Sequence, residues 1–377
     1  MESKFNMKKI LFAKPSITKK EIDYVNDAVK NGWGLNCYDY IHRFTDKLKN
    51  YFNSPYVWPT SSCHGALHII LMALGIGKND EVIVPDMTWI GSVTPISWLG
   101  ATPVFVDVLE DCLSIDPSKI EKAITKKTKA IIVVHPYGNV AKMDEIIAIG
   151  KKYKIDIIED AAEAIGSEYK NQKVGSIADF GVISLHGTKT LTSGEGGAIF
   201  CKRKDLVDKI TIIESQGRNA SRKVDFWVDE IGLKYKMSNI QAALGLAQFE
   251  RADDLIKKKI QIFNWYKKNL KFFSDIFLNP RPAQTKNSYW LPTIIFGKSW
   301  NFNLDKRNRL LNNLNKKDIA VRPIFYPVSS FPMYQDCPNN FVSQDIYKRG
   351  INLPSYFEMT EDDTKYVVDA INKELII

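Results

Sequence analysis

Residues 130–160 read AIIVVHPYGNVAKMDEIIAIGKKYKIDIIED, which is an apolar run, a segment with helical spacing and a second apolar run. Both runs are rich in Val and Ile and are nearly continuous, as is typical of strands that are covered on both faces. Between them, residues 143–153 have the periodicity of an amphipathic helix. The stretch therefore predicts a strand, a helix and a second strand parallel to the first, because parallel neighbours need a long crossover connection.

The same alternation extends over residues 60 to 202. Further apolar runs occupy residues 81–86, 103–108, 180–187 and 196–202. Short apolar runs that alternate with helical segments predict an α/β fold with a mostly parallel sheet. Ligands of such sheets bind at the carboxyl ends of the strands. Polar residues stand at several of these ends, namely Asp86, Asp107, His135, Asp160 and His186.

Beyond residue 237 the pattern changes. Residues 237–270 keep a helical periodicity with few helix-breaking residues, which predicts one long connecting helix. Asn279-Pro280-Arg281-Pro282 then interrupts the pattern, and the last hundred residues mix short strands with helices. We therefore predict a large domain over residues 1–250 and a smaller C-terminal α/β domain over residues 251–377.

The net charge of +9, from 52 Lys+Arg and 43 Asp+Glu, raises the question of a polyanionic partner. The basic residues are mostly dispersed, however, and runs such as residues 257–259 are expected on solvated helix faces. No zinc-finger spacing or RNA-recognition signature accompanies them. A nucleic-acid-binding protein is therefore a weak alternative, and it would show a steep dependence of binding on salt.

Cysteines and apolar windows exclude further classes. The five cysteines contain no C-x-x-C pair, so neither a disulfide framework nor a metal site is expected. The uncharged window 88–106 is long enough to span a bilayer, but its prolines and glycines favour a buried helix, turn and strand. The N-terminus lacks the apolar core of a signal peptide. We expect a cytoplasmic protein without a membrane partner.

Residues 184–197, SLHGTKTLTSGEGG, are the most informative stretch for chemistry. Lys189 comes just after an apolar strand and precedes a turn rich in hydroxyls and glycine. A lysine that is desolvated in such a place is a nucleophile toward aldehydes. The alternative is a surface lysine on a turn.

Three further segments point to the same edge of the sheet. Asp160 could face a pyridine nitrogen and keep that ring protonated, which is what pyridoxal phosphate (PLP) requires, or it could cap a helix. Residues 61–65, SSCHG, precede an apolar helix, and a helix N-terminus binds phosphate well. An N-cap is the alternative there as well. Trp89 follows a strand end and could stack on a planar cofactor or lie in the core.

Together these segments resemble the DegT/DnrJ/EryC1/StrS family of PLP-dependent sugar aminotransferases. The resemblance runs nearly from end to end, from Pro15 to Pro354, and it is most specific in segments 79–85, 99–107, 159–162, 184–197 and 239–248. Within the family, the lysine segment and residues 322–327 resemble the members like GDP-perosamine synthase. The resemblance implies the PLP-dependent transferase fold of type I, which is the aspartate aminotransferase-like fold.

The resemblance also implies the roles of individual residues. Lys189 would hold PLP as a Schiff base and then move the proton, and Asp160 would pair with the pyridinium nitrogen; these two are the catalytic residues. The other residues implied to contact the cofactor ring or its phosphate are Cys63, His64, Trp89, Glu163, Ser184 and Lys234. Those implied to contact the substrate are Trp33, His186, Arg322 and Tyr326.

The reaction that the resemblance implies is a two-step transfer. L-Glutamate leaves its amino group on the cofactor, which becomes pyridoxamine phosphate (PMP). A nucleotide-linked 4-keto-6-deoxyhexose then collects that group and becomes a 4-amino-4,6-dideoxy sugar nucleotide of the perosamine or viosamine type. Such sugars enter O-antigens and other polysaccharides. Family members are typically homodimers whose active sites are completed by the partner chain.

Several positions depart from the family pattern. Cys63-His64 replaces a usual Gly-Thr in the phosphate turn, and Lys234 replaces an asparagine. Tyr38 occupies a usual glycine, and the histidine that is common after Tyr326-Pro327 is missing. The nucleotide and the configuration of the sugar therefore stay open.

Three alternatives within the fold also stay open. A 3-keto sugar aminotransferase would share the motifs described above. A PLP-dependent sugar dehydratase would carry histidine in place of Lys189. A catalytically silent PLP-binding protein would bind the cofactor without turnover.

Overall fold

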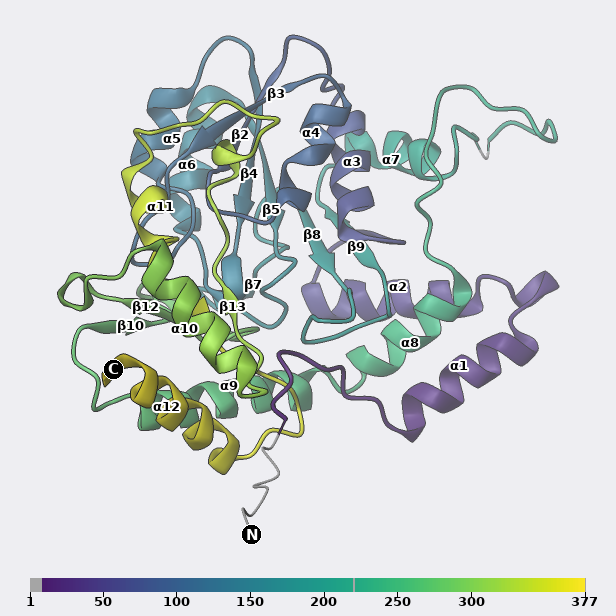
Figure 1. Ribbon diagram of the computed structural model, residues 1–377. Helices are drawn as coiled ribbons and strands as arrows, with labels where there is room; N and C mark the ends of the chain where they lie inside the picture. The colour runs from purple at the N-terminus through teal and green to yellow at the C-terminus, as the bar shows by residue number, and fades with distance from the viewer. Residues whose placement is uncertain (1–8, 220, 377) are drawn as a thin grey trace.

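The computed structural model describes residues 9–219 and 221–376. Its centre is a seven-stranded sheet in the order β1-β9-β8-β5-β4-β2-β3 (Figure 1). The strands are β1 (Tyr56–Thr60), β2 (Glu81–Pro85), β3 (Thr102–Val106), β4 (Thr128–Val134), β5 (Asp156–Asp160), β8 (Phe180–Ser184) and β9 (Gly197–Cys201). Five neighbouring strands from β8 to β3 are parallel, and β9 is antiparallel to both β8 and β1. The predicted α/β fold with a mostly parallel sheet is confirmed.

Helices cover both faces of this sheet because its strands are apolar on both sides. On β4, Ile131 and Val133 pack with residues of α5 (Pro117–Ala123) and α6 (Met143–Tyr153). The alternate residue Ile132 faces the opposite core, which includes residues of α3 (Cys63–Ala73), α4 (Thr94–Trp98) and α7 (Val207–Glu214). Strand side chains alternate in direction, so one apolar run supplies two cores.

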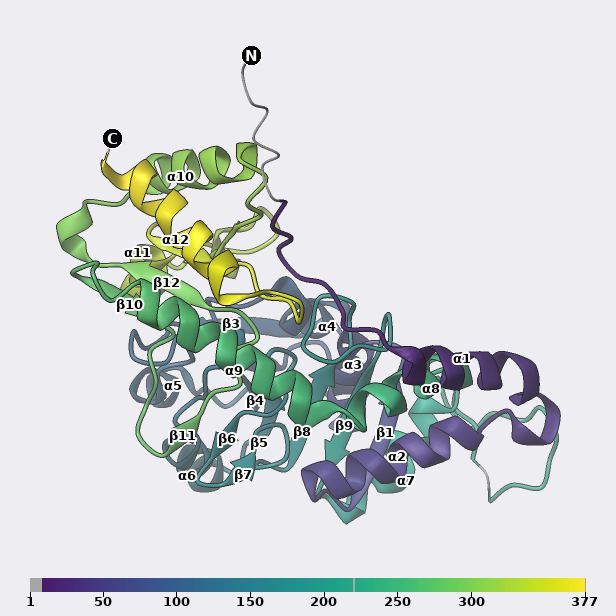
Figure 2. The same cartoon turned by 90° about the horizontal axis from the view of Figure 1, so that it is seen from below.

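A third core joins the outer end of the sheet to the N-terminal helices. It contains residues of α2 (Asp39–Phe52) and α8 (Asn239–Phe249) together with one face of β8 and β9. The helix α1 (Lys19–Asn31) lies beside α8, as Figure 2 shows. These helices extend the molecule well to one side of the central sheet.

The C-terminal residues build a second, antiparallel sheet in the order β10-β12-β14-β13. Its strands are β10 (Ile276–Leu278), β12 (Thr293–Phe296), β13 (Arg322–Pro323) and β14 (Gly350–Asn352). Its core includes residues of α9 (Ala252–Asn269), α10 (Leu304–Lys316) and α12 (Glu361–Ile376), and Ile10 from the other end of the chain. Besides short 3-10 helices, the structure also has α11 (Phe341–Ile346) and a small sheet of β6 (Glu168–Tyr169), β7 (Gln172–Lys173) and β11 (Thr285–Lys286).

The single long helix predicted over residues 237–270 is wrong. The structure has two helices, α8 and α9, which are separated at Glu250 and Arg251. Arg251 leaves the helical conformation, with φ −113° and ψ 12°. Its guanidinium donates to Glu21 Oε1 at 2.6 Å and to Ser16 Oγ at 3.0 Å. These hydrogen bonds to distant residues occur where the helix is interrupted. The sequence has no glycine or proline at this point that would have predicted the interruption.

A second expectation fails at one position of α9, whereas Lys257 is exposed as expected. Residues 257–259 were predicted to lie on a solvated helix face, but Lys259 is 7% exposed. Its ammonium donates to the carbonyl oxygens of Trp290 and Ser355 and to Ser355 Oγ. These contacts supply three acceptors for the three donors of the ammonium group.

The uncharged window 88–106 forms a short 3-10 turn, α4 and β3, so the predicted helix, turn and strand are present. The predicted burial holds only in part, because Trp98 of α4 is 58% exposed. Among the helices of the described residues, none combines the length and the apolar character that a membrane span requires.

Candidate functional site

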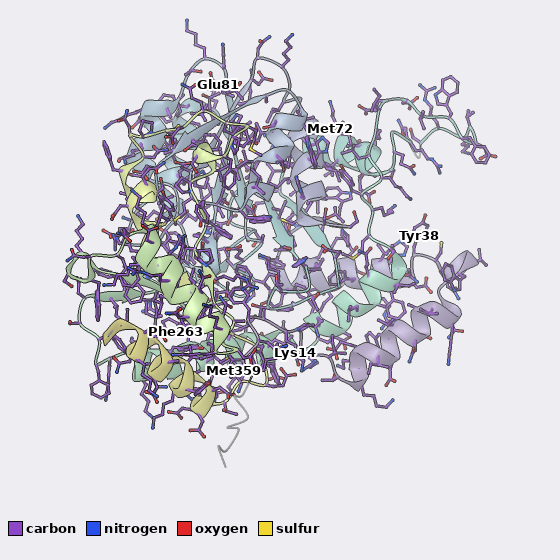
Figure 3. The ribbon with its side chains drawn as sticks, in the orientation of Figure 1. Lys14, Tyr38, Met72, Glu81, Phe263 and Met359 are labelled. Atoms are coloured by element: carbon purple, nitrogen blue, oxygen red, sulfur yellow. The ribbon has the colours of Figure 1, made fainter. Side chains whose placement is uncertain are left out.

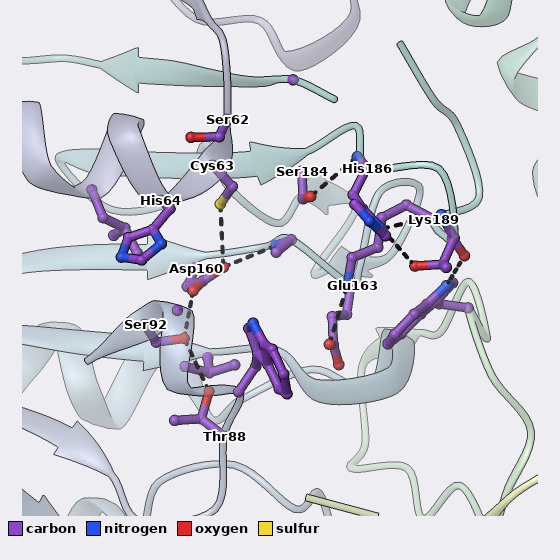
Figure 4. A pocket seen from close by; sticks show the side chains of 18 of the residues that line it. Ser62, Cys63, His64, Thr88, Ser92, Asp160, Glu163, Ser184, His186 and Lys189 are labelled. Atoms are coloured by element: carbon purple, nitrogen blue, oxygen red, sulfur yellow. Dashed lines mark hydrogen bonds and ion pairs between the residues drawn. The ribbon is translucent and has the colours of Figure 1, made fainter. Parts of the chain in front are cut away.

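A cavity of about 380 Å³ opens at the carboxyl edge of the central sheet. The ends of β4, β5 and β8 and the start of α3 contribute to its wall, as Figure 4 shows for the labelled side chains. Eight of the predicted site residues line this cavity: Cys63, His64, Trp89, Asp160, Glu163, Ser184, His186 and Lys189. The fold thus brings together residues that lie up to 126 positions apart (189 − 63 = 126).

The start of α3 is held close to the sheet. A Cβ atom on Gly197 of β9 would lie only 2.5 Å from the backbone nitrogen of Cys63, so only glycine permits this approach. Ser62 caps the helix, with its Oγ accepting from Gly65 N at 3.0 Å. The backbone N–H groups of Cys63 and His64 belong to the first turn and have no partner within the helix. The segment is therefore both an N-capped helix and a place where an anion can bind.

Asp160 lies at the end of β5 and is 4% exposed. Its Oδ2 accepts from Ser92 Oγ at 2.8 Å, and its Oδ1 accepts from Ala162 N at 3.0 Å. Residues 161–166 form turns, so the carboxylate closes a turn and does not cap a helix. The Cys63 thiol lies 3.9 Å from Oδ1. Burial and the nearby Asp160 charge raise the pKa of this thiol well above its usual value, so it stays protonated and can donate.

Lys189 points its amine at a carboxylate and at an aromatic face. Its Nζ lies 3.2 Å from Glu163 Oε1 and 3.7 Å from the centre of the Trp290 ring. Glu163 is buried, which raises the pKa of its carboxyl group, while the charge of Lys189 acts in the opposite direction. Its Oε2 accepts from the backbone N–H of Tyr137 at 2.8 Å. A lysine on an exposed turn, the alternative considered above, does not fit a side chain that is 13% exposed.

Comparison with known proteins identifies the family. The model of the DegT/DnrJ/EryC1/StrS aminotransferase family matches residues 15–372. The GDP-perosamine synthase of Escherichia coli O157:H7 is 39% identical over 368 residues, which cover 97% of this chain and 99% of the relative. The GDP-perosamine synthase of Caulobacter vibrioides is 33% identical over 374 residues, which cover 98% of this chain and 100% of the relative.

The chain belongs to the DegT/DnrJ/EryC1/StrS aminotransferase family. Solved structures agree with this assignment. Spr1654 from Streptococcus pneumoniae in its PLP-form has a TM-score of 0.90 at 29% identity, with 98% of this chain and 99% of that chain covered. Its PMP-form gives a TM-score of 0.89 at 28% identity, with 97% and 99% covered. The fold is that of the PLP-dependent sugar aminotransferases, and the protein is a PLP-dependent transaminase.

The residues of the cavity fit this cofactor. An amine for its aldehyde carbon, a buried carboxylate for its ring nitrogen and a free helix N-terminus for its phosphate all line one space. Gly91 adds room for an aromatic neighbour, since a Cβ atom there would lie 2.9 Å from Trp89 Cδ1. Trp89 is 63% exposed, and its ring centre lies 6.2 Å from that of Phe325. Within the described residues, no group of His, Cys, Asp and Glu is arranged to hold a metal ion.

Two histidines of the site have partners of their own. The His64 ring stacks on Trp98 with 4.5 Å between centres, and its Nε2 lies 2.6 Å from Thr94 Oγ1. Burial lowers the pKa of His64, which favours the neutral ring. His186 accepts from the backbone N–H of Thr188 through Nδ1, so its other nitrogen carries the proton in the neutral ring.

Four predicted site residues do not line the cavity. Trp33 is 63% exposed and donates through Nε1 to Val29 O, and Lys234 is exposed. The guanidinium of Arg322 lies over the ring of Phe12, and Tyr326 accepts from Arg307 at 2.7 Å. Tyr38, one of the departures from the family pattern, lies on the extension that carries α1 and α2 (Figure 3). The functional roles of these residues stay predictions.

Sequence reasoning missed an aromatic wall of the cavity. Trp290 and Phe325 line the cavity, and the ring of Tyr137 stacks on both. Trp290 donates through Nε1 to Thr188 O at 2.7 Å, directly beside Lys189. Tyr137 accepts from Phe325 N at 2.7 Å and has φ 58°, a strained conformation for a bulky residue. The three rings come from segments that are far apart in the sequence. Only Tyr137 could have been predicted, because it follows the end of a predicted strand.

Proposed function

We propose that this transaminase moves the amino group of L-glutamate to C4 of a nucleotide-linked 4-keto-6-deoxyhexose. The product is a 4-amino-4,6-dideoxy sugar nucleotide of the perosamine or viosamine type. The observation that carries the proposal is the set of Lys189, Asp160 and Glu163 in one cavity of a chain whose relatives include three GDP-perosamine synthases at 33% to 39% identity. L-Glutamate leaves as 2-oxoglutarate, and the keto oxygen of the sugar leaves as water.

The chain's own side chains divide the work. PLP, when bound, supplies an electron sink for the carbon that loses its proton. The Lys189 amine would hold the cofactor through its aldehyde carbon and would move the proton between C4′ of the cofactor and the substrate carbon. Glu163 holds that amine from 3.2 Å, and the Asp160 carboxylate balances the positive ring nitrogen. Ser184 and the first turn of α3 would hold the phosphate, because they offer a hydroxyl and free N–H groups.

Relatives also support the position of amination. A transaminase of Campylobacter jejuni that is 30% identical is named for a UDP-4-amino-4,6-dideoxy sugar, and the three synthases are named for a GDP sugar. The Campylobacter name gives an amino group on C4 of a 4,6-dideoxy sugar, and perosamine is itself a 4-amino-4,6-dideoxyhexose. We therefore propose C4 over C3 and take GDP as the first nucleotide to test.

We further propose that the enzyme is a homodimer and that Lys234 reaches the phosphate of the neighbouring site. Large apolar side chains of residues 221–236 stand in solvent, with Phe226 92% and Ile231 86% exposed. Several large apolar side chains exposed within one short segment support a surface that another protein covers. Lys234 belongs to the same segment, and its side chain is exposed in this chain. The two-domain division at residues 250 and 251 and a cytoplasmic location stay predictions as well.

Mixing two inactive variants tests the shared site. In a mixed dimer of Lys189→Ala and Lys234→Ala chains, one of the two sites would combine an intact Lys189 with an intact Lys234 from the other chain. We expect activity to reappear on mixing, up to about half of the wild-type value per mixed dimer. If Lys234 served its own chain, mixing would restore nothing.

The substrate is tested by product analysis. The purified protein is incubated with PLP, L-glutamate and GDP-, dTDP- and UDP-linked 4-keto and 3-keto 6-deoxysugars, and the products are identified by mass spectrometry. We expect an amino sugar nucleotide from a 4-keto substrate and none with the Lys189→Ala variant. A catalytically silent PLP-binding protein would keep the visible absorbance of its bound cofactor unchanged when L-glutamate is added.

A further inference from the structure

Asp160 ends a chain of buried hydroxyl groups. Ser92 Oγ lies 2.8 Å from Asp160 Oδ2, and Thr88 Oγ1 lies 3.0 Å from Ser92 Oγ, as the dashed lines in Figure 4 show. The exposed fractions are 4% for Asp160, 3% for Ser92 and 2% for Thr88. The chain of contacts crosses from the end of β5 to the segment after β2, on the two sides of β4.

The direction of the hydrogen bonds follows from the donors available. An ionised carboxylate can only accept, so Ser92 must donate its single hydroxyl proton to Asp160. Ser92 Oγ then has only lone pairs to offer, and the proton between the two hydroxyls must come from Thr88. Thr88 therefore donates to Ser92, and Ser92 donates to Asp160.

Counting acceptor positions shows what this arrangement leaves free. A carboxylate offers about four lone-pair positions, two on each oxygen. On Oδ1, Ala162 N–H and the protonated Cys63 thiol occupy both. On Oδ2, Ser92 occupies one. With the partners that the described residues supply, a single acceptor position remains on Oδ2, the oxygen that accepts from Ser92.

We propose that Thr88 and Ser92 are positioning residues that hold the Asp160 carboxylate so that its one open acceptor position serves the protonated ring nitrogen of PLP. The proposal rests on the function proposed above, in which Asp160 faces that nitrogen. A carboxylate that could rotate would point its open acceptor position at the ring nitrogen only part of the time. Fixing it beforehand avoids reorganisation when charge develops during the reaction.

Paired variants separate the hydroxyl from the space that it fills. Ser92→Ala removes the donor to Asp160. Thr88→Val removes the outer hydroxyl at nearly constant shape, and Thr88→Ser restores it. Ser97→Ala is the matched control, because Ser97 is exposed on α4 and contacts Tyr334 instead of Asp160.

The decisive readout is the protonation of the cofactor ring. PLP labelled with ¹⁵N at the ring nitrogen is bound to each variant, and its chemical shift is followed against pH. We expect the ring nitrogen of the Ser92→Ala protein to lose its proton at a lower pH than in the wild type. Thr88→Val shifts it less, and Thr88→Ser and Ser97→Ala leave it unchanged.

Binding and turnover should follow the same order. Loss of a hydrogen bond to a charged group corresponds to about 10- to 100-fold. We expect Ser92→Ala to raise the dissociation constant of PLP about 10-fold and to lower kcat about 10- to 100-fold, with little change in the KM for L-glutamate. Thr88→Val should lower kcat about 3- to 10-fold, since Ser92 keeps its hydroxyl but loses its fixed direction.

The proposal would be overturned by a folded Ser92→Ala protein whose ring-nitrogen titration and kcat equal those of the wild type. An equal loss in Thr88→Val and Thr88→Ser would also contradict it, because packing alone would then account for the effect. The ring-nitrogen signal needs only protein and PLP. It therefore tests the roles of Thr88 and Ser92 even if the protein accepts no nucleotide sugar. Failure to accept any nucleotide sugar would contradict only the proposed substrate.

Discussion

The two sides of the active site are built differently. The cofactor side gathers Lys189, Asp160 and Glu163 from strand ends of one sheet, with short contacts among buried atoms. On the substrate side, Trp33 is exposed and lies outside the cavity, as do Arg322 and Tyr326. Side chains at the ends of sheet strands are held by the packed sheet. Side chains on exposed segments have fewer contacts within the chain and are more mobile. Most predicted contacts of the cofactor are therefore gathered in one cavity of this chain, whereas three of the four predicted sugar contacts lie outside that cavity.

The largest expected effect comes from Lys189→Ala. Removing the amine that binds the cofactor and carries the proton should lower transamination by about 10⁴-fold or more. Lys209→Ala, an exposed lysine on α7, is the matched control and should keep wild-type activity. Turnover is measured with L-glutamate and the preferred nucleotide sugar. A Lys189→Ala protein that retained turnover would break the assignment of the cofactor side.

Asp160→Asn should have the second largest effect. An amide of the same shape cannot balance a positive ring nitrogen, so we expect kcat to fall by about 10²- to 10³-fold. Its amide would also face the proton that Ser92 donates. The rate of the L-glutamate half-reaction, followed by cofactor absorbance, measures the loss. A change confined to the KM for the nucleotide sugar would instead move Asp160 to the substrate side.

Trp290 tests the boundary between the two sides. Its ring lies 3.7 Å from Lys189 Nζ, and a cation over an indole face is stabilised by about 0.5 to 2 kcal/mol. We expect Trp290→Leu to lower kcat about 10-fold and Trp290→Phe to recover most of it, since phenylalanine keeps an aromatic face. Single-turnover kinetics with L-glutamate provide the measurement. Equal losses in both variants would show that the ring face plays no part.

The last prediction concerns stability instead of turnover. Lys259 donates to the backbone carbonyl of Trp290. Burial lowers the pKa of Lys259 from its usual 10.5 to about 7. Between pH 7 and 10.5 the unfolded chain therefore binds one more proton than the folded one, so this group makes the free energy of unfolding rise with pH. Lys259→Met should remove that rise. Denaturant unfolding at pH 7 and pH 9 compares the two proteins, and an identical pH dependence would contradict a lowered pKa of Lys259 in the folded protein.

The sequence predicted what local pattern controls. Continuous apolar runs revealed the strands, and the polar residues at their ends included Asp160 and His186. Lys189 followed from its place after an apolar strand. Ser92 and Trp290 carry no such local sign, because each reaches the site only through tertiary contacts. The break at Arg251 and the burial of Lys259 likewise depend on partners far away in the chain, Glu21 and Ser355.

Transfer of an isotope tests the central claim most directly. The wild-type protein is incubated with ¹⁵N-labelled L-glutamate and a GDP-linked 4-keto-6-deoxyhexose, and the product is analysed by NMR. We predict that the label appears on C4 of the sugar and that Lys189→Ala transfers none. Label on C3, or label transfer that does not depend on Lys189, would contradict the account.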